Sequence, residues 1–139
     1  MIFLDSNILI DVIEFDQDWE KWSSSQIEDA GKVDRLVINE IVVAEAAPRS
    51  GPLEQFENSM EIMGISLEPL SIQAAYRAGQ TFQIYRQNRP NYAKRSILAD
   101  FLIGGHAEVM HATILTRDPR FYRTYFPSVP LITPDKAGT

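Results

Sequence analysis

The chain has 139 residues and a mass of 15.8 kDa, which is the size of one ordinary domain with a single core. Its composition, 45% hydrophobic and 23% charged, excludes disordered and collagen-like proteins. The lack of cysteine excludes disulfide frameworks, thiolate metal sites and cysteine nucleophiles. No apolar run approaches the ~20 residues of a membrane-spanning helix, and no signal peptide precedes the first apolar run. We therefore expect a single cytoplasmic domain over residues 1–139.

The formal net charge of −6 is unevenly distributed. Residues 1–70 carry fifteen acidic and four basic side chains, whereas residues 71–139 carry nine basic and four acidic ones. Aromatic residues are interleaved with two basic clusters, namely Arg86, Arg89, Lys94 and Arg95 with Phe82, Tyr85 and Tyr92, and Arg117, Arg120 and Arg123 with Phe121, Tyr122 and Tyr125. Arginine beside aromatic rings is typical of single-stranded nucleic-acid binding, because guanidinium groups contact phosphate and rings stack on bases. The alternative is a solvated helix face with its aromatic residues in the core.

Apolar runs alternate with amphipathic segments along the chain, and Gly, Pro and capping residues, among them Asp5 and Asn39, mark their ends. In the first half of the chain we expect a strand at 1–4, a helix from about 8, a helix within 16–31 with Trp19 and Trp22 on its buried side, a strand at 36–38, helices at 40–47 and 53–63, and a strand at 65–70. A helix should follow at 71–86, with an apolar stripe formed by Ile72, Ala75, Ala78, Phe82 and Tyr85. The rest of the chain predicts a loop at 88–91, a helix from Ser96, and strands at 113–116 and 129–132. Strands alternating with helices predict crossover connections, hence an α/β domain with a mostly parallel sheet.

Acidic side chains follow several of these strands. Asp5 comes directly after the first, Glu40 and Glu45 lie in the helix after the second, and Asp118 comes two residues after the fourth. Asp100 lies in an otherwise apolar stretch, where a charge needs solvent, a partner or a cation. Each residue taken singly is equally compatible with a helix cap, a turn or an exposed helix edge. Since ligands of open α/β sheets bind beyond the carboxyl ends of the strands, however, the same residues are also placed to form one site.

A cluster of such carboxylates would need a counter-charge. Two carboxylates ~4 Å apart repel by roughly 4 kcal/mol at an effective dielectric of about 20, so an uncompensated cluster takes up protons or destabilises the fold. A divalent cation removes this conflict, and an all-oxygen ligand set selects Mg²⁺ or Mn²⁺. These ions activate water and stabilise phosphoryl displacement, which indicates phosphate or phosphodiester chemistry. His106 and His111 have no second His or Cys partner at metal-site spacing, and we expect them to be structural or solvent-facing.

Four segments, in order, resemble the motifs of PIN-domain ribonucleases: residues 4–9, 38–45, 99–103 and 114–122. The short chain is similar to VapC-type toxins of prokaryotic toxin–antitoxin pairs. The resemblance implies a PIN-like three-layer α/β/α fold with a central, mostly parallel sheet of about five strands. It also implies a Mg²⁺- or Mn²⁺-dependent endoribonuclease that cleaves RNA phosphodiesters with a metal-activated water, leaving 5′-phosphate and 3′-hydroxyl ends. The partners it implies are a cognate antitoxin protein and a second copy in a homodimer.

The resemblance also assigns roles to residues. It implies catalytic and metal-binding roles for four carboxylates, Asp5, Glu45, Asp100 and Asp118, and places Ser6, Asn7 and Thr116 at polar positions that orient them. Glu45 is preferred over Glu40 because the family's glutamate follows an apolar run and a small residue, and the two lie about 140° apart around a helix. We expect Glu40 to act as an N-terminal dipole partner. Gly104 and Gly105 replace the mostly alanine residues of the family and predict a bent or closely packed helix.

Six basic residues are expected to line an RNA path beside the acidic centre: Arg86, Arg89, Lys94, Arg95, Arg117 and Arg120. Two other phosphate chemistries lack a required residue. A haloacid-dehalogenase phosphatase needs an aspartate where Asn7 stands, and residues 67–70 do not supply the phosphoacceptor aspartate of a receiver domain. The remaining alternative is a catalytically silent PIN-like module that acts through a protein partner. The apolar residues around Trp19, Trp22 and Phe56 are candidates for the dimer surface.

Overall fold

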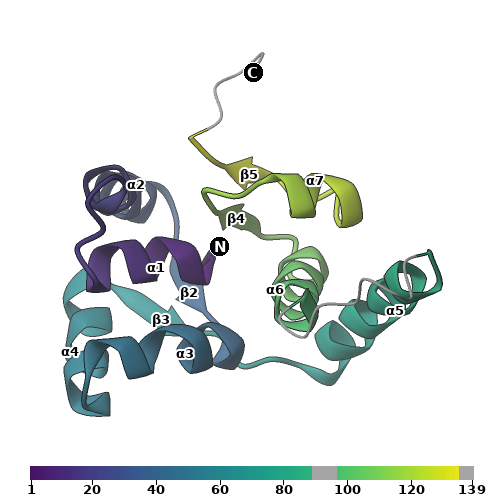
Figure 1. The fold of residues 1–139 in the computed structure, drawn as a ribbon, viewed down its shortest axis with the longest axis horizontal. Helices are drawn as coiled ribbons and strands as arrows, with labels where there is room; N and C mark the ends of the chain where they lie inside the picture. The colour runs from purple at the N-terminus through teal and green to yellow at the C-terminus, as the bar shows by residue number, and fades with distance from the viewer. Residues whose placement is uncertain (89–96, 135–139) are drawn as a thin grey trace.

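The computed structural model describes residues 1–88 and 97–134 (Figure 1). Its elements are β1 (Ile2–Leu4), α1 (Ser6–Ile13), α2 (Glu20–Val33), β2 (Leu36–Ile38), α3 (Glu40–Ala46), the 3-10 helix η1 (Ala47–Ser50), α4 (Leu53–Met63), β3 (Ile65–Leu67), α5 (Ile72–Asn88), α6 (Ile97–Val109), β4 (Thr113–Leu115), α7 (Arg120–Tyr125) and β5 (Leu131–Ile132). The five strands form one parallel sheet in the order β3-β2-β1-β4-β5.

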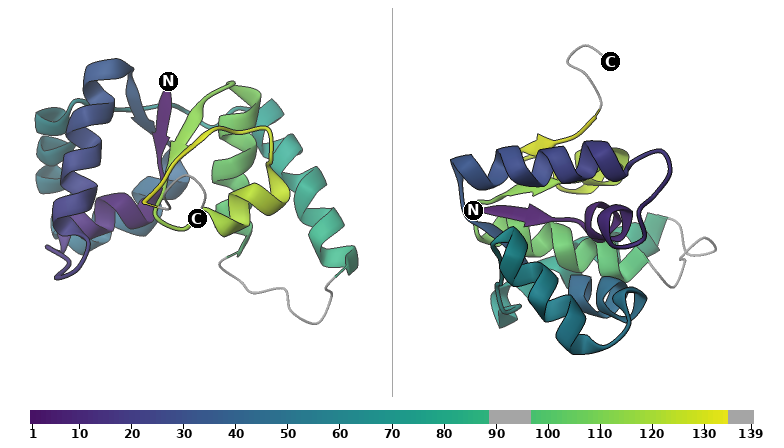
Figure 2. Two further views of the ribbon diagram at one scale, coloured as in Figure 1. Left: turned by 90° about the horizontal axis from the view of Figure 1, so that it is seen from above. Right: turned by 90° about the vertical axis from the view of Figure 1, so that its left-hand side faces the viewer.

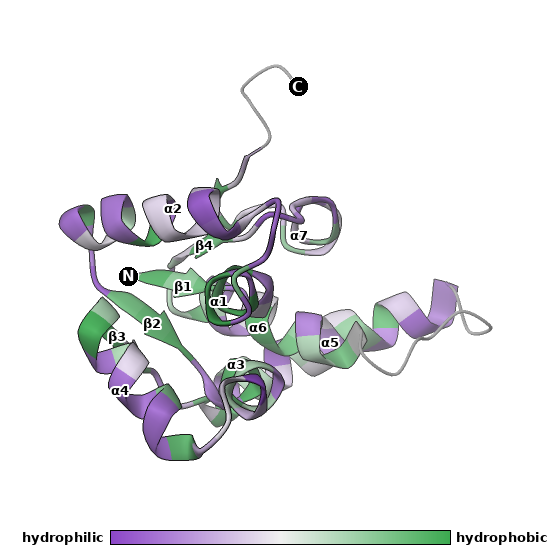
Figure 3. Cartoon of the chain, turned by 60° about the vertical axis from the view of Figure 1, so that its left-hand side comes forward, coloured by the Kyte–Doolittle hydropathy of each residue, from purple (hydrophilic) through white to green (hydrophobic). Residues whose placement is uncertain are grey.

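Helices cover both faces of this sheet (Figure 2). Helices α1, α2 and α4 lie on one side, whereas α6 and α7 lie on the other and α5 packs against α6. The central strands are apolar along their length, as the colouring of β1 and β2 in Figure 3 shows, and every residue of these two strands is buried. Strands buried on both faces have no polar side to alternate with, which explains their continuous apolar runs. The expected three-layer α/β/α architecture is confirmed.

The register of β1 and β4 places their carboxyl ends side by side. Phe3 pairs with Ile114 and Leu4 pairs with Leu115. The chain continues this alignment by one residue, because the Asp5 backbone N–H donates to the Leu115 carbonyl at 2.9 Å. The residues that follow the two strands, Asp5 and Thr116, are therefore brought together from opposite ends of the sequence.

A buried polar bridge joins α3 to α6. Asn39 caps α3 as expected, and its Oδ1 accepts from the backbone N–H of Ile41 at 3.0 Å and of Val42 at 3.2 Å. Its Nδ2 therefore faces His106 of α6 and donates to Nδ1 at 3.1 Å. The His106 ring is fully buried, lies 4.7 Å from the Phe3 ring, and has its pKa lowered by burial. His106 is structural and His111 is exposed, so both fit the expectation for the histidines.

The two glycines of α6 allow close packing on both sides of that helix. A Cβ on Gly104 would overlap the Phe126 ring, and one on Gly105 would lie 2.8 Å from the Ala78 backbone nitrogen in α5. Alanine would therefore collide at both positions. The close packing predicted from Gly104 and Gly105 is confirmed, and it fixes the depth at which α6 lies in the fold.

Two expected helix faces are confirmed only in part. Helix α2 begins at Glu20 and buries Ser23, Ile27 and Ala30, and Trp22 packs partly buried against the core. Trp19 precedes the helix, because the Asp16 carboxylate accepts from the N–H groups of residues 18 and 19 and forms a turn there. In α5 the expected stripe fails at Ile72, which is 86% exposed. The buried residues of α5 are Ala74, Ala78, Thr81 and Tyr85, since small side chains let α5 approach the glycine of α6.

Other boundaries differ more modestly. The strand expected at 65–70 ends at Leu67, and helix α7 after β4 was not anticipated. The expected start of α6 at Ser96 and most of the loop at 88–91 lie outside the described residues. No helix within the described ranges is long and apolar enough to cross a membrane.

Substituting Gly105 tests the close contact of α5 and α6. Gly105→Ala should lower the free energy of unfolding by about 1–3 kcal/mol, because the new methyl meets backbone that cannot move away. Gly79→Ala is the matched control in the neighbouring helix, where a Cβ meets nothing within 4 Å. It should instead stabilise by roughly 0.5–1 kcal/mol. Urea denaturation measures both, and an unchanged Gly105→Ala protein would contradict the packing described here.

Candidate functional site

Asp5 lies buried between the ends of β1 and β4, with only 5% of its surface exposed. It caps α1, and its Oδ1 accepts from the Ser6 backbone N–H at 2.8 Å. Its Oδ2 accepts from the Thr116 hydroxyl at 2.9 Å and from the Tyr122 phenol at 3.0 Å. Burial raises the pKa of Asp5, whereas these hydrogen bonds oppose the rise by favouring the carboxylate. The result is a carboxylate with a fixed orientation.

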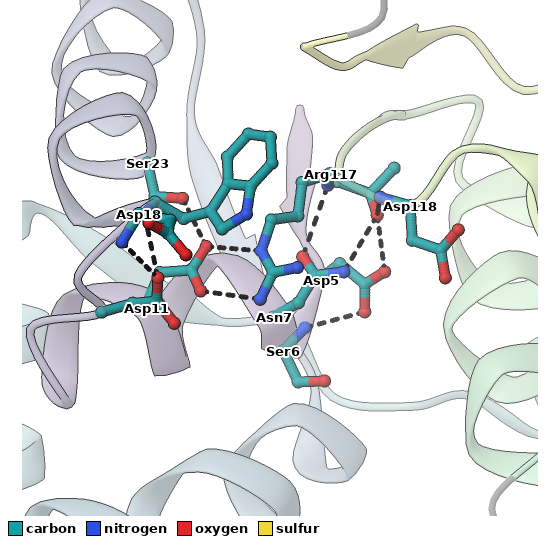
Figure 4. Close-up of polar contacts among 11 residues, drawn as sticks. Asp5, Ser6, Asn7, Asp11, Asp18, Ser23, Arg117 and Asp118 are labelled. Atoms are coloured by element: carbon teal, nitrogen blue, oxygen red, sulfur yellow. Dashed lines mark hydrogen bonds and ion pairs between the residues drawn. The ribbon is translucent and has the colours of Figure 1, made fainter.

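The Thr116 side chain organises the loop after β4. Figure 4 shows the next two residues of this loop, Arg117 and Asp118. While it donates to Asp5, the Thr116 Oγ1 accepts from the Asp118 backbone N–H at 3.0 Å and from Asn7 Nδ2 at 3.4 Å. Asn7 Oδ1 in turn accepts from the Arg117 backbone N–H at 3.5 Å. Thr116 therefore contacts Asp5 and Asp118, two of the residues that it was expected to orient, whereas Asn7 contacts Thr116 and the Arg117 backbone. Ser6 contributes its backbone N–H to Asp5.

The four candidate carboxylates interact electrostatically. Asp100 lies half-buried in α6, and burial together with the charges of Asp5, Glu45 and Asp118 raises the pKa of Asp100 to about 7. Glu45, near the end of α3, also contributes to the raised pKa of Asp5. Its Oε1 is buried and has no hydrogen-bond partner among the described residues. The fold thus brings Asp5, Glu45 and Asp118 close enough to Asp100 for their charges to raise its pKa.

These carboxylates do not form a ready-made metal site. Within residues 1–88 and 97–134, no three His, Asp or Glu side chains converge closely enough to hold an ion as they are placed. The Asp118 side chain is exposed, and Glu45 and Asp100 are half-buried around the buried Asp5. The four acidic residues therefore form a cluster in which the Asp5 carboxylate is fixed and the side chains of Glu45, Asp100 and Asp118 are less enclosed.

Glu40 has a different partner. It is the first residue of α3, is exposed, and accepts from the Leu70 backbone N–H at 2.9 Å. This bond ties the start of α3 to the segment that follows β3. Glu40 contributes to none of the shifts in the pKa of Asp5 or Asp100, whereas Glu45 contributes to both. The preference for Glu45 over Glu40 therefore agrees with the electrostatics.

The expected RNA-binding residues separate into three groups. Arg86 and Arg120 are exposed, and the Arg86 guanidinium lies 5.9 Å from the centre of the Phe82 ring. Arg117 instead directs its guanidinium to the buried carboxylate of Asp11. The remaining three, Arg89, Lys94 and Arg95, lie outside the described residues.

Most of the aromatic residues near these clusters belong to the core. Tyr85 and Tyr122 are buried, and Phe101 lies at the centre of a group of rings that includes Phe82, Tyr85, Phe121, Tyr125 and Phe126. The buried rings therefore agree with the alternative that these aromatic residues belong to the core and do not stack on bases. Tyr92 lies outside the described residues. Phe56 itself is only 3% exposed, whereas Leu53 and Ile62 of the same helix are exposed, and a dimer surface in this region stays a prediction.

Sequence reasoning missed two contributors to this site. Tyr122, which donates to Asp5, looked like a stacking residue because α7 was not predicted. Asp11, which binds Arg117, was not singled out. The available signal was its spacing, since Asp11 lies four residues after Asn7 and therefore on the same face of α1.

The charge on Asp100 should make stability pH-dependent. A folded-state pKa near 7, against an ordinary value of 3.8, means that Asp100 contributes stability at low pH that is lost as the pH rises through about 7. With divalent ions chelated, Asp100→Asn should therefore raise the free energy of unfolding at pH 8 by about 1 kcal/mol or more. The gain should shrink towards pH 4. Urea denaturation at several pH values measures it, with exposed Asp29→Asn as the control, and parallel pH profiles would contradict the shift.

Comparison with known proteins places the chain in a family. The profile of the PIN domain matches residues 2–127. No curated protein sequence matches the chain.

Similar solved structures include VapBC2 from Rickettsia felis bound to a DNA fragment from its promoter, with 23% identity, a TM-score of 0.69 and coverage of 96% of this chain and 98% of that chain. A toxin–antitoxin complex from Klebsiella pneumoniae shows 20% identity, a TM-score of 0.66 and coverage of 98% and 99%. VapBC-1 from nontypeable Haemophilus influenzae shows 20% identity, a TM-score of 0.66 and coverage of 96% and 98%. These likenesses agree with the fold described above, and, on the profile match, the chain belongs to the PIN domain family.

Proposed function

We propose that the chain is a Mg²⁺- or Mn²⁺-dependent endoribonuclease and the toxin of a VapC-type toxin–antitoxin pair. The observation that carries the proposal is that Asp5, Glu45 and Asp118 lie close enough to Asp100, beyond the ends of β1 and β4, for their charges to raise its pKa. Membership of the PIN domain family and structural likeness to toxin–antitoxin complexes support it. The proposed partners are an RNA substrate, an antitoxin protein and a second copy of the chain.

The donor set fits a hard divalent cation. All four candidate ligands are carboxylates, which suit Mg²⁺ and Mn²⁺. The buried Glu45 Oε1 has no hydrogen-bond partner among the described residues, and burial together with the surrounding negative charge raises the pKa of Asp100 to about 7. A cation would relieve both conditions. To hold it, the less enclosed side chains of Asp118, Glu45 and Asp100 would approach the fixed carboxylate of Asp5.

The chain's own residues supply positioning. Thr116 and Tyr122 direct their hydroxyl hydrogens at Oδ2 of Asp5, and the Ser6 N–H donates to Oδ1, which leaves one lone pair of Oδ1 for a cation. Burial excludes water from that carboxylate and strengthens its interaction with a cation. When bound, a divalent ion supplies a Lewis acid that activates water and stabilises charge on a transferring phosphoryl group. Arg86 and Arg120 are exposed and available for RNA phosphates.

Cleavage of RNA tests the acidic centre. Asp118→Asn and Glu45→Gln should each reduce Mg²⁺-dependent cleavage by about 100-fold or more, because each removes a ligand charge. Glu40→Gln is the control, since its amide oxygen can still accept from Leu70. The assay is incubation of total RNA with Mg²⁺, Mn²⁺ or chelator, followed by mapping of 5′-phosphate and 3′-hydroxyl ends. Full activity of both site variants would refute the assignment. No cleavage by the unaltered chain, together with capture of an antitoxin, would favour a catalytically silent module.

Salt dependence tests the RNA path. In chelator, Arg86→Gln and Arg120→Gln should each weaken RNA binding and reduce the slope of log affinity against log salt by about 0.7, the effect of one lost contact to single-stranded phosphate. Arg35→Gln serves as the control, because Arg35 is paired with Glu68 at 3.0 Å on the acidic half of the chain. Fluorescence anisotropy with a labelled single-stranded RNA measures the slopes. Slopes equal to that of the unaltered chain would remove Arg86 and Arg120 from the path.

A further inference from the structure

An ion pair between the buried Asp11 and the partly exposed Arg117 lies beside the candidate carboxylates. Asp11 of α1 is 1% exposed, and the Arg117 guanidinium binds it with both arms of its fork: Nε donates to Oδ2 at 2.8 Å and Nη2 donates to Oδ1 at 2.9 Å. The Ser23 hydroxyl of α2 also donates to Asp11 Oδ2, at 2.7 Å. The hydrogen bond to Asp11 raises the pKa of Arg117. A buried carboxylate that loses its partner is strongly disfavoured, so Asp11 holds this guanidinium firmly.

Further contacts make this pair a clamp on one residue of the loop after β4. The Arg117 guanidinium lies 5.3 Å from the centre of the Trp19 ring, and its backbone N–H donates to Asn7 Oδ1 at 3.5 Å. Arg117 is therefore attached to α1 through both main chain and side chain, and to the start of α2 through Trp19. We call the contacts among Asp11, Ser23 and Arg117 the clamp.

Arg117, the clamped residue, lies between two residues of the candidate site. Thr116 precedes it and orients Asp5, whereas Asp118 follows it and carries a candidate ligand. In Figure 4 the Arg117 side chain extends toward Asp11 while the Asp118 carboxylate points to the opposite side of the loop. Among the described residues, no hydrogen bond or ion pair holds the Asp118 carboxylate itself. Its position therefore depends on the loop backbone, which the clamp and the Asp118 N–H bond to Thr116 fix.

We propose that Asp11 and Arg117 are positioning residues that set the Asp118 carboxylate for a divalent cation, a role that rests on the proposed function. This assignment replaces the RNA-binding role expected for Arg117, because its fork is occupied by Asp11. The planar guanidinium of Arg117 suits this role, because its two parallel hydrogen bonds to Asp11 fix the direction of the side chain as well as its distance. Lysine would keep the charge but offers a point contact in place of two parallel bonds.

The test measures Mn²⁺ affinity by isothermal titration calorimetry, with Mn²⁺ alone as the probe. Arg117→Lys and Asp11→Asn should each weaken Mn²⁺ binding about tenfold or more, as expected when a group that orients a metal ligand is lost. Because both break the same contact, the double variant should lose little more than the worse single variant. The matched control is Arg49→Lys, which alters an exposed pair between Arg49 and Glu14, at 3.1 and 3.2 Å, just after α1. Its Mn²⁺ affinity should not change.

Metal-free amide hydrogen exchange separates the clamp from the proposed function. In Arg117→Lys and Asp11→Asn the Asp118 amide should exchange about tenfold faster, because the loop opens more often, whereas Arg49→Lys should leave it unchanged. Ser23→Ala removes one bond to Asp11 without altering the loop sequence and replaces any variant that fails to fold. Folded variants with unaltered Mn²⁺ affinity and unaltered exchange overturn the clamp. An unaltered chain that binds no Mn²⁺ overturns the proposed function, and the exchange rates then decide the clamp alone.

Discussion

The candidate site depends on one buried carboxylate whose position is set by the sheet. Asp5 follows the central strand β1, and the parallel register with β4 brings Thr116 to its side. Because the carboxylate is withdrawn from water, it needs donors, and the Ser6 N–H, Thr116 and Tyr122 supply them. Each of these donors belongs to a different element or loop. The burial of Asp5 therefore links the start of α1, the loop after β4 and helix α7 in a single arrangement.

The other carboxylates reach Asp5 through helix packing. Asp100 is carried by α6, whose depth is fixed by Gly104 against Phe126 and by Gly105 against Ala78. His106, on the same helix, is bonded to Asn39, the cap of the helix that carries Glu45. The elements that bear Asp100 and Glu45 are thus joined by a neutral, buried polar bridge. The negative charge at the centre is concentrated by this packing, and the raised pKa of Asp100 is its electrostatic consequence.

Arg117 shows why residue type alone does not define a binding surface. A basic residue next to Asp118 looks suited to an RNA phosphate, yet its guanidinium is turned to the buried Asp11. A solvated arginine contributes to long-range attraction, whereas one that neutralises a buried carboxylate contributes mainly to geometry. The adjacent side chains of Arg117 and Asp118 consequently point to opposite sides of the same loop (Figure 4).

Local signals in the sequence determined the α/β class, most strand positions, the caps at Asp5 and Asn39 and the close packing of Gly104 and Gly105, because strand hydrophobicity, capping side chains and missing side chains act within a few residues. The order of acidic residues after the strands also marked the candidate carboxylates. Only the tertiary structure decided that Ile72 is exposed, that Tyr122 donates to Asp5 and that Asp11 binds Arg117. These outcomes depend on contacts between segments up to 117 residues apart, which are fixed by the packing of the whole core and leave no periodic trace in the chain.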